Sequence, residues 1–421
     1  MKIILVNYRY FISGGPERYM FNVKTLLEEK GHTVIPFSIR YKQNQPTPWS
    51  RYFVPPLTSE DEVTFSDHSY TIKGFIRTLN RAFYSSEVYR SLKELLMATK
   101  PDVALVLNYL KKLSPSVLVA LKEQKVPIIT RLSDFFMLCP EAHFLRQGCI
   151  CEKCINGKLW PSVYHRCIKK SFGVSIINAC STHYHRKKKF FDLIDAFITP
   201  SSFTKRKMVD GGWPQEKIFH IPTFVNLDSI KPRHDKKPMI SYVGRVHEIK
   251  GIEILLDAFS LLKKDKAYRA IQLNIIGGGT KPYIDKLKKY IERINTSEIV
   301  CYDNLDLDRI AHLLSGSLFS VIPSLCYENM PNAALESFAC GTPVIASDLG
   351  SLPEIVNSTV GDTFTAGDVH DLYHKMVRLL ENPSVLQEMG MQARKYAENN
   401  YNPQLHYDRL SQLITKVIHE S

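Results

Sequence analysis

The stretch MISYVGRVHEIKGIEILLDAFSLL, residues 239–262, contains the unit from which we predict the fold. Its first part, 239–244, is an apolar run that ends in glycine, which indicates a buried strand. A turn with Arg245, Lys250 and a second glycine follows, and residues 252–262 then form an apolar helical run. Strand, glycine turn and helix in this order are typical of a parallel α/β sheet, in which ligands bind at the carboxyl ends of the strands.

The same alternation extends in both directions and predicts two Rossmann-like halves. Before the opening stretch it predicts strands at 3–6, 33–37, 102–107, 127–131 and 196–199, with helices at 19–29 and 202–209. After that stretch it predicts strands at 273–276, 299–302, 318–323 and 344–347. We therefore expect an N-terminal domain over 1–222 and a C-terminal domain over 223–401, with a last helix, about 402–421, that crosses back. The sequence of residues 40–75 predicts a long loop, and that of residues 220–223 predicts the linker between the two domains.

Composition and charge exclude some classes of protein. The 421 residues are 44% hydrophobic and 23% charged, as in a soluble globular protein, and no run approaches the roughly 18 apolar residues of a membrane span. The start, MKIILVN, predicts a buried strand and not a signal peptide, so we expect a cytoplasmic protein.

The formal net charge is +13, and part of the excess lies at 169–170 and 185–189. The second run is followed by two phenylalanines at 190–191. Basic residues beside bulky apolar ones suit an anionic membrane surface, which would make the protein peripheral on the inner face of a membrane. A solvated helix face is an equal alternative, and no nucleic-acid-binding motif is present.

Two glycine turns suit an anion. Arg245 and Lys250 lie where a helix begins, so a diphosphate there would meet two cations, free backbone N–H groups and the helix dipole. Gly14 and Gly15 form a second turn, in which glycine permits positive φ and a close approach of backbone to phosphate. The glycines 277–279 lack the spacing of a dinucleotide fingerprint, which argues against a nicotinamide-dependent enzyme.

Two carboxylates follow in the segment 324–336. Glu328 lies in a polar turn that contains proline, and Glu336 lies in a helical run rich in alanine and leucine. Both are expected to face one crevice. Charged side chains are rarely buried without a partner, and the hydroxyls of a sugar and of a ribose would be suitable partners.

In combination these motifs resemble the retaining glycosyltransferases of family 4, the group 1 glycosyltransferases, which have the GT-B fold. The segments that match, in chain order, are 14–18, 200–204, 244–251, 277–279, 323–336 and 341–354. The resemblance implies two Rossmann-like domains that face each other across a cleft. It also implies transfer of a sugar from a nucleotide-diphosphate donor to an acceptor hydroxyl, with retention and without a catalytic metal.

The resemblance also implies roles for individual residues. Arg245 and Lys250 would bind the donor diphosphate, Glu328 the hydroxyls of the sugar and Glu336 the ribose. The turn formed by Asn329, Met330, Pro331 and Asn332 would supply backbone donors, and Gly14 and Gly15 would close over the phosphates. The acceptor is expected to be a growing glycan, on a lipid carrier, of a bacterial surface polysaccharide.

The sequence departs from the family pattern in two places. Relatives often have an aromatic residue and glycine where this chain has Asn329 and Met330. They also often have His-Asp before an aromatic pair and Cys-Pro, whereas here Ser133 stands in the histidine position. Asp134 remains the candidate to orient or deprotonate the acceptor hydroxyl, and the alternative is a carboxylate that caps a turn.

A cysteine-rich segment has no place in this scheme. Cys151 and Cys154 have metal-ligand spacing, and Cys139 with Cys167 would complete four thiolates on a structural zinc. Reduced, partly buried thiols are the equal alternative, and His143 and His165 are possible substitute ligands. Two other functions stay open: a sugar-nucleotide epimerase of similar fold, and a zinc-bearing nucleic-acid binder.

Overall fold

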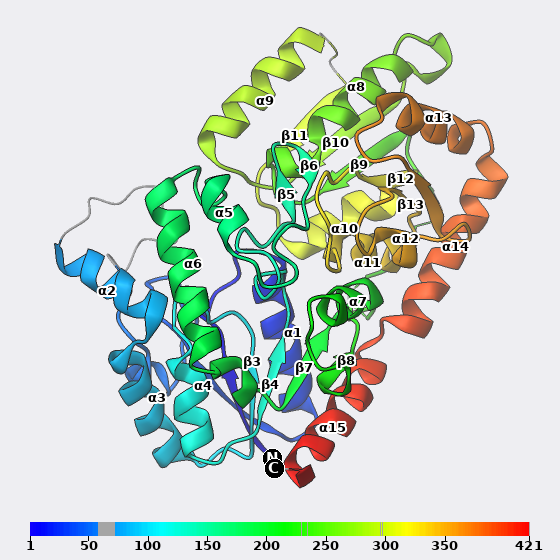
Figure 1. Ribbon diagram of the computed structural model, residues 1–421. Coiled ribbons are helices and arrows are strands. Elements are labelled where there is room, and N and C mark those ends of the chain that lie inside the picture. The colour runs from blue at the N-terminus through cyan, green and yellow to red at the C-terminus, as the bar shows by residue number, and fades with distance from the viewer. Residues whose placement is uncertain (58–71, 229, 234, 295, 297, 421) are drawn as a thin grey trace.

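The computed structural model describes residues 1–57, 72–228, 230–233, 235–294, 296 and 298–420. Its first half is built on a six-stranded sheet in the order β2-β1-β3-β4-β7-β8 (Figure 1). Every pairing in this sheet is parallel. The strands are β1 (Lys2–Val6), β2 (Thr33–Phe37), β3 (Val103–Val106), β4 (Ile128–Arg131), β7 (Ala196–Thr199) and β8 (Ile218–His220).

The second half repeats this plan with a parallel sheet in the order β11-β10-β9-β12-β13-β14. In both sheets strand order reverses beside the first strand of the half, which is where doubly wound sheets bind ligands. The predicted architecture of two Rossmann-like units is therefore confirmed. The strands are β9 (Met239–Val243), β10 (Gln272–Ile276), β11 (Ile299–Tyr302), β12 (Phe319–Ile322), β13 (Val344–Ser347) and β14 (Gly361–Phe364).

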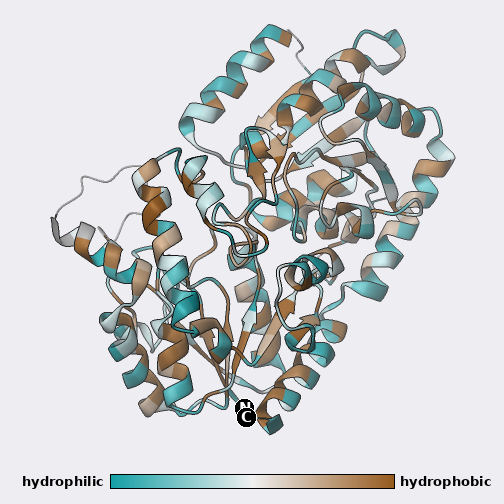
Figure 2. Cartoon of the chain, viewed as in Figure 1, coloured by the Kyte–Doolittle hydropathy of each residue, from teal (hydrophilic) through white to brown (hydrophobic). Residues whose placement is uncertain are grey.

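Helices cover both faces of each sheet, with their apolar sides turned inward (Figure 2). Among the described helices, none combines the length and the apolarity that crossing a bilayer requires. Those of the first half are α1 (Gly15–Glu29), α2 (Ile72–Phe83), α3 (Ser86–Thr99), α4 (Ser116–Glu123), α5 (Trp160–Tyr164), α6 (Phe172–Lys187) and α7 (Ser202–Asp210). Those of the second are α8 (Ile252–Leu262), α9 (Lys281–Ile294), α10 (Leu307–Gly316), α11 (Asn332–Ala339), α12 (Leu352–Ile355), α13 (Val369–Leu380) and α14 (Pro383–Asn400).

The last helix, α15 (Pro403–Glu420), packs against the first half. Its apolar side joins the core beneath β1 and α1, where Leu410 and Ile414 are buried. His406 is also buried, and its Nε2 lies 3.2 Å from the Tyr19 hydroxyl while its Nδ1 lies 2.7 Å from the carbonyl oxygen of Pro222. Burial lowers the pKa of His406 to about 3, so this imidazole is neutral in the folded chain.

Two local predictions need correction. The predicted loop 40–75 contains a 3-10 turn at Ser50–Tyr52 and the start of α2, and residues 58–71 lie outside the described residues. His220 ends β8, so it belongs to the first sheet and not to a linker. Both errors arise because short elements at a sheet edge show little hydrophobic periodicity and are held by tertiary contacts.

Candidate active site

A cavity of about 1590 Å³ lies between the two halves. Its lining comes from loops at the carboxyl ends of strands in both sheets. We call the part contributed by the loops after β1, β3 and β4 the first-sheet wall. The part contributed by the loops after β9, β10, β11 and β12 is the second-sheet wall.

Glu328 and Lys250 form an ion pair in the second-sheet wall. The Ser324 hydroxyl also donates to the Glu328 carboxylate, whose residue is only 9% exposed. Burial alone would raise the pKa of this carboxyl, but Lys250 and Ser324 hold that pKa below its usual value. The cavity therefore contains a fixed, ionised carboxylate beside a cation.

Two glycines position this pair because backbone passes where a side chain would be. A Cβ on Gly251 would lie 1.9 Å from the carbonyl oxygen of Pro323, and φ at Gly251 is +66°. A Cβ on Gly350 would lie 2.7 Å from the backbone nitrogen of Glu328. Glycine is required at both positions by sterics and by the left-handed backbone.

Arg245 lies in the same wall, in the turn between β9 and α8, and is exposed to solvent. Its carbonyl oxygen accepts a hydrogen bond of 2.8 Å from the hydroxyl of Tyr242, which fixes the backbone of the turn. The structure thus brings Arg245, Lys250 and Glu328 to one cavity at the start of α8, where a helix favours an anion.

Glu336 lies on α11 and faces the same cavity. Its Oε1 is 2.5 Å from a guanidinium nitrogen of Arg18, which comes from α1 in the first half. Its Oε2 is buried and has no hydrogen-bond partner within the described residues. Burial raises the pKa of Glu336, and Arg18 opposes this increase. The unpartnered oxygen is suited to accept a hydroxyl hydrogen bond.

Gly14 and Gly15 also line the cavity, at the start of α1. The expectation that they use positive φ is wrong: Gly14 is extended, with φ −179°, and Gly15 is the first helical residue. What Gly15 provides is close approach, since a Cβ there would lie 3.3 Å from Nδ2 of Asn332. The two halves therefore meet across this glycine.

The predicted donor turn contacts the first half through its side chains. Nδ2 of Asn329 donates 2.8 Å to the carbonyl oxygen of Leu132, and Oδ1 of Asn329 accepts from the hydroxyl of Thr204. The sulfur of Met330 accepts from the backbone N–H of Thr223 at 3.3 Å. Asn329, Met330, Pro331 and Asn332 all line the cavity.

Asp134 is half-buried in the first-sheet wall. Its Oδ1 accepts a 2.9 Å hydrogen bond from the backbone N–H of Phe136, which is the turn-capping contact expected as the alternative role. Burial raises the pKa of Asp134, while Lys111 opposes the shift. The neighbouring Ser133 hydroxyl accepts 3.2 Å from Arg131. The structure thus places Asp134 at the cavity without excluding either role.

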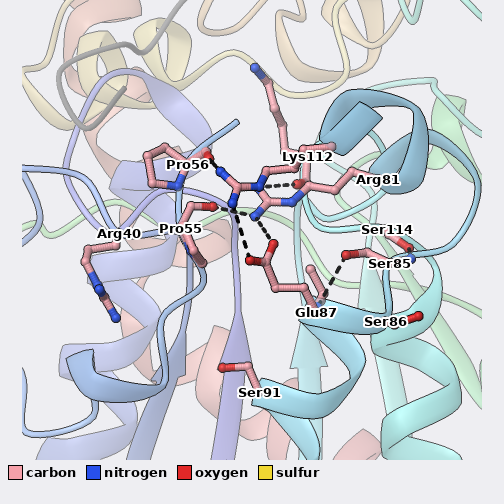
Figure 3. Close-up of polar contacts among 12 residues, drawn as sticks. Arg40, Pro55, Pro56, Arg81, Ser85, Ser86, Glu87, Ser91, Lys112 and Ser114 are labelled. Atoms are coloured by element: carbon pink, nitrogen blue, oxygen red, sulfur yellow. Dashed lines mark hydrogen bonds and ion pairs between the residues drawn. The ribbon is translucent and has the colours of Figure 1, made fainter. Parts of the chain in front are cut away.

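A buried arginine holds the loop after β3, which belongs to the first-sheet wall (Figure 3). Arg81, on α2, is fully buried and donates to the carbonyl oxygens of Pro55 and Lys112. It also pairs with Glu87 at 3.3 Å. Sequence patterns did not indicate this network, because its acceptors are two backbone carbonyls from separate segments and the Glu87 carboxylate.

Tyr327 is a further residue that the sequence analysis missed. It belongs to the second half, yet its ring packs among Phe203, Phe144 and Phe135 of the first half, with centroids 4.8, 5.7 and 6.4 Å away. Its hydroxyl donates 2.9 Å to Glu152, which also pairs with Lys207 at 2.7 Å. The only signal in the sequence was its position next to Glu328.

The predicted zinc site at Cys139, Cys151, Cys154 and Cys167 is not supported. Burial, followed by the thiols of Cys139, Cys167 and Cys151, raises the pKa of Cys154 to about 12. In the described residues, which include all of 139–180, no three His, Cys, Asp or Glu side chains are placed to hold a metal ion. The alternative of reduced, partly buried thiols describes these cysteines.

The predicted basic and apolar surface at 185–194 also needs correction. The cations at 187–189 are exposed, but Phe190 and Phe191 are buried in the core, and His185 is buried with its Nε2 3.0 Å from the carbonyl oxygen of Phe83. The exposed aromatic residues lie instead on α5 and at the start of α6. Phe190 and Phe191 instead fill the interior of the first half.

Comparison with known proteins matches residues 237–382 to the family model described as "Glycosyl transferases group 1". The fold resembles sucrose-phosphate synthase from Thermosynechococcus elongatus, with a TM-score of 0.73, 17% identity and coverage of 100% of both chains. It also resembles HepE from Anabaena in complex with UDP, with a TM-score of 0.66, 15% identity and coverage of 99% of this chain and 100% of the other.

Curated relatives match part of the chain. An MMP alpha-(1->4)-mannosyltransferase of Mycolicibacterium hassiacum is 29% identical over 222 residues, 50% of this chain and 51% of that protein. The capsular polysaccharide biosynthesis glycosyltransferase CapM of Staphylococcus aureus is 27% identical over 185 residues, 44% of this chain and 47% of that protein. The chain thus spans about half the length of these relatives.

Proposed function

From the premise that the chain belongs to the group 1 glycosyltransferases and has their GT-B fold, we propose that it transfers a sugar, with retention, from a nucleotide-diphosphate donor to an acceptor hydroxyl. The observation that carries this proposal is the composition of the second-sheet wall. Arg245 and Lys250 lie near the start of a helix and line the same cavity as the buried carboxylates of Glu328 and Glu336. A nucleotide sugar has groups that suit both kinds of side chain: a diphosphate for the cations, and sugar and ribose hydroxyls for the carboxylates.

In this proposal the donor is bound across the second-sheet wall. Its diphosphate lies at Arg245 and Lys250, its ribose hydroxyls bond the unpartnered Oε2 of Glu336, and its sugar hydroxyls bond Glu328. The diphosphate displaces Glu328 from part of its contact with Lys250, which frees the carboxylate for the sugar. Structures of Anabaena HepE with UDP and with UDP-glucose, which share this fold, support a nucleotide sugar as the ligand class.

The reaction breaks the bond between the anomeric carbon and the diphosphate oxygen, and forms a bond to the acceptor oxygen. Arg245, Lys250 and the helix start stabilise the negative charge that develops on the departing diphosphate. The acceptor proton passes to the leaving phosphate on the same face of the sugar, and Asp134 orients the acceptor hydroxyl. Because two cations supply the charge, no catalytic metal is needed, and chelation of metals with EDTA should leave the rate unchanged.

The test is to incubate the protein with UDP-glucose, UDP-galactose, UDP-N-acetylglucosamine and GDP-mannose, and to measure release of the nucleoside diphosphate. At least one donor should be consumed, and Lys250→Ala and Glu328→Ala should each abolish most of this release. Absence of release from every donor would overturn the proposal. Conversion of one sugar nucleotide into another without release would instead identify an epimerase.

We also propose that the acceptor is a lipid-linked glycan of a surface polysaccharide, reached from an anionic membrane. The support is the surface formed by α5 and the start of α6, which we call the α5–α6 surface. Trp160 and Tyr164 are 65% and 72% exposed there, and Phe172 is 54% exposed. Exposed cations of the same segment are Lys158, Arg166, Lys169 and Lys170. Residues 153–191 contain no Asp or Glu.

Aromatic side chains beside cations are the composition of proteins that lie on anionic bilayers. The double variant Trp160→Ala/Tyr164→Ala should lose sedimentation with phosphatidylglycerol vesicles, and wild type should not sediment with phosphatidylcholine. Lys187→Ala/Lys188→Ala, at the opposite end of α6, is the matched control and should bind as wild type does. If the control loses binding and the aromatic variant does not, the proposal that the α5–α6 surface binds the membrane is wrong.

A further inference from the structure

His143 is a residue of the first-sheet wall to which the family resemblance gave no role. It is half-buried and lines the cavity together with Asp134, Arg245, Lys250 and Glu328. Sequence analysis treated it as a possible substitute metal ligand. Its position in the cavity, on the same loop as Asp134, calls for a specific role.

The backbone on both sides of His143 is strained. Ala142 and Phe144 have φ of +68° and +51°, in the left-handed region that residues with a Cβ seldom adopt. Two such residues around one side chain persist only where their surroundings enforce them, and such strain is concentrated at functional sites.

The surroundings that enforce this geometry are well defined. The side chain of Phe144 is fully buried, with its ring 5.2 Å from Phe135 and 5.7 Å from Tyr327. The N–H of Ala142 donates 2.8 Å to the carbonyl oxygen of Cys139, and the carbonyl oxygen of Phe144 accepts 2.7 Å from the N–H of Cys151. These anchors hold the loop on both sides while His143 reaches the cavity.

The charged groups near His143 come from the second-sheet wall. Burial, followed by Arg245 and Lys250, lowers the pKa of His143 to about 4; Glu328 opposes this and His247 adds to it. Near neutral pH the imidazole is therefore uncharged, with one N–H donor and one acceptor nitrogen. Such a group can hydrogen-bond a sugar hydroxyl that Glu328 also contacts, and it adds no charge beside the two cations.

We propose that His143 is a further catalytic residue, which hydrogen-bonds the transferring sugar from the first half, opposite Glu328, when both halves enclose the donor. The inference rests on the proposed function and adds a residue to the same site. Ser133, in the position where relatives often have histidine, accepts a 3.2 Å hydrogen bond from the buried Arg131. Tyr327 of the second half packs on Phe144, next to His143, so docking of the halves adds a contact to the loop that carries the imidazole.

The experiment compares His143→Ala, His143→Gln and the matched control His165→Ala, which changes a histidine of the same cysteine-rich segment outside the cavity lining. Turnover of the consumed donor should fall by about 10²-fold in His143→Ala, the loss typical of one hydrogen-bond donor to a transition state. His143→Gln should recover at least about tenfold of that loss, because its amide keeps a donor and an acceptor. His165→Ala should match wild type.

Three further readouts separate a chemical role from a structural one. Affinity for UDP and GDP, measured by calorimetry without a sugar, should be unchanged in both His143 variants, as should the thermal midpoint. Equal losses of kcat, nucleotide affinity and thermal stability in both variants would overturn the inference, as would wild-type kcat in His143→Ala while Lys250→Ala is inactive. If wild type releases nucleoside diphosphate from no donor, the proposed function fails and this inference with it.

Discussion

The two walls of the cavity are built in different ways. The second-sheet wall contains the ion pair of Lys250 and Glu328 and the exposed Arg245. It also contains the Glu336 carboxylate, one oxygen of which has no hydrogen-bond partner among the described residues. Glycines support this wall because they let one backbone segment contact another.

The first-sheet wall presents aromatic rings, a strained loop and a buried arginine that holds carbonyl oxygens. Charged side chains such as Lys111 and Asp134 also line the first-sheet wall, but the buried ion pair lies on the second. We call the second-sheet wall the charged wall, and the first-sheet wall, with its rings and strained loop, the shaped wall.

This difference shows how the work is divided in the proposed reaction. A diphosphate needs fixed charge, which short turns at helix starts provide. An acceptor needs a shaped surface and one or two polar contacts, which loops on a rigid sheet provide. Substitutions in the charged wall should therefore affect chemistry. Substitutions at the aromatic contacts of the shaped wall should affect closure and stability, whereas those of His143 in that wall should affect chemistry.

The largest effect is expected at the charged wall. Glu328→Ala and Lys250→Ala should each lower kcat/KM by about 10²- to 10³-fold, since each removes electrostatic stabilisation and leaves its partner uncompensated. The double variant should lose little more than either single one, because the two side chains form one unit. Lys286→Ala, which breaks the exposed ion pair with Glu253 at 2.8 Å, is the control and should leave kcat/KM unchanged. Additive losses in the Lys250→Ala and Glu328→Ala variants would contradict the conclusion that the two side chains act as one unit.

The next effect concerns the glycine that supports this wall. Gly251→Ala should cost more than the ~1–2 kcal/mol of a left-handed residue, because its Cβ meets the carbonyl oxygen of Pro323 at 1.9 Å. Gly31→Ala separates the two causes, since φ at Gly31 is +81° and nothing lies within 4 Å of a Cβ there. Urea unfolding of both variants measures the difference. Equal losses of unfolding free energy in the two variants would show that the left-handed backbone, and not the contact with Pro323, sets the cost.

The contact between the shaped wall and the second half is tested at Tyr327. Tyr327→Ala removes the ring from between Phe203 and Phe144 and should raise the donor KM by about tenfold, since about 1.4 kcal/mol of docking energy corresponds to that factor. Tyr327→Phe keeps the ring and loses only the hydrogen bond to Glu152, so its KM should change by less than about threefold. If both variants behave alike, the hydroxyl and not the ring joins the halves.

The last prediction is a pH dependence at His406, which contacts the cavity-lining Tyr19. Because the pKa of His406 is lowered to about 3 in the folded chain, the unfolded chain binds the extra proton below its ordinary pKa of 6.5. Stability contributed by neutral His406 is thus complete above pH 6.5 and is lost as the pH falls toward 3, by up to about 1.4 kcal/mol per pH unit. Urea midpoints between pH 7.5 and 5 should show this slope in wild type and a reduced slope in His406→Gln. An unchanged slope would assign the dependence to other groups.

The sequence predicted the second half better than the first. Strands such as Val344–Ser347 and the helix Ile252–Leu262 match the structure because each carries its own apolar run bounded by glycine or proline. The charged side chains of the second-sheet wall were found for the same reason, since they lie next to those elements in the chain.

The first-sheet wall resisted prediction because its contacts join distant segments. Nothing local to Tyr327 indicates a pocket of three phenylalanines, all of which lie more than a hundred residues away in the chain. Likewise, the burial of Phe190 and Phe191 depends on the core of the whole half, so their place beside a basic run was misleading. Backbone strain around His143 has no sequence signature, because its cause is tertiary.

The return of α15 to the first half has a consequence for synthesis on the ribosome. Ile3 and Leu5 share a core with Leu410, Leu413 and Val417, so these early residues wait for residues that are made much later. Until α15 emerges, the apolar surface beneath β1 and α1 stays uncovered while the second half is being made. The nascent first half therefore needs a chaperone or rapid completion of the chain, and a chain arrested before residue 403 should aggregate.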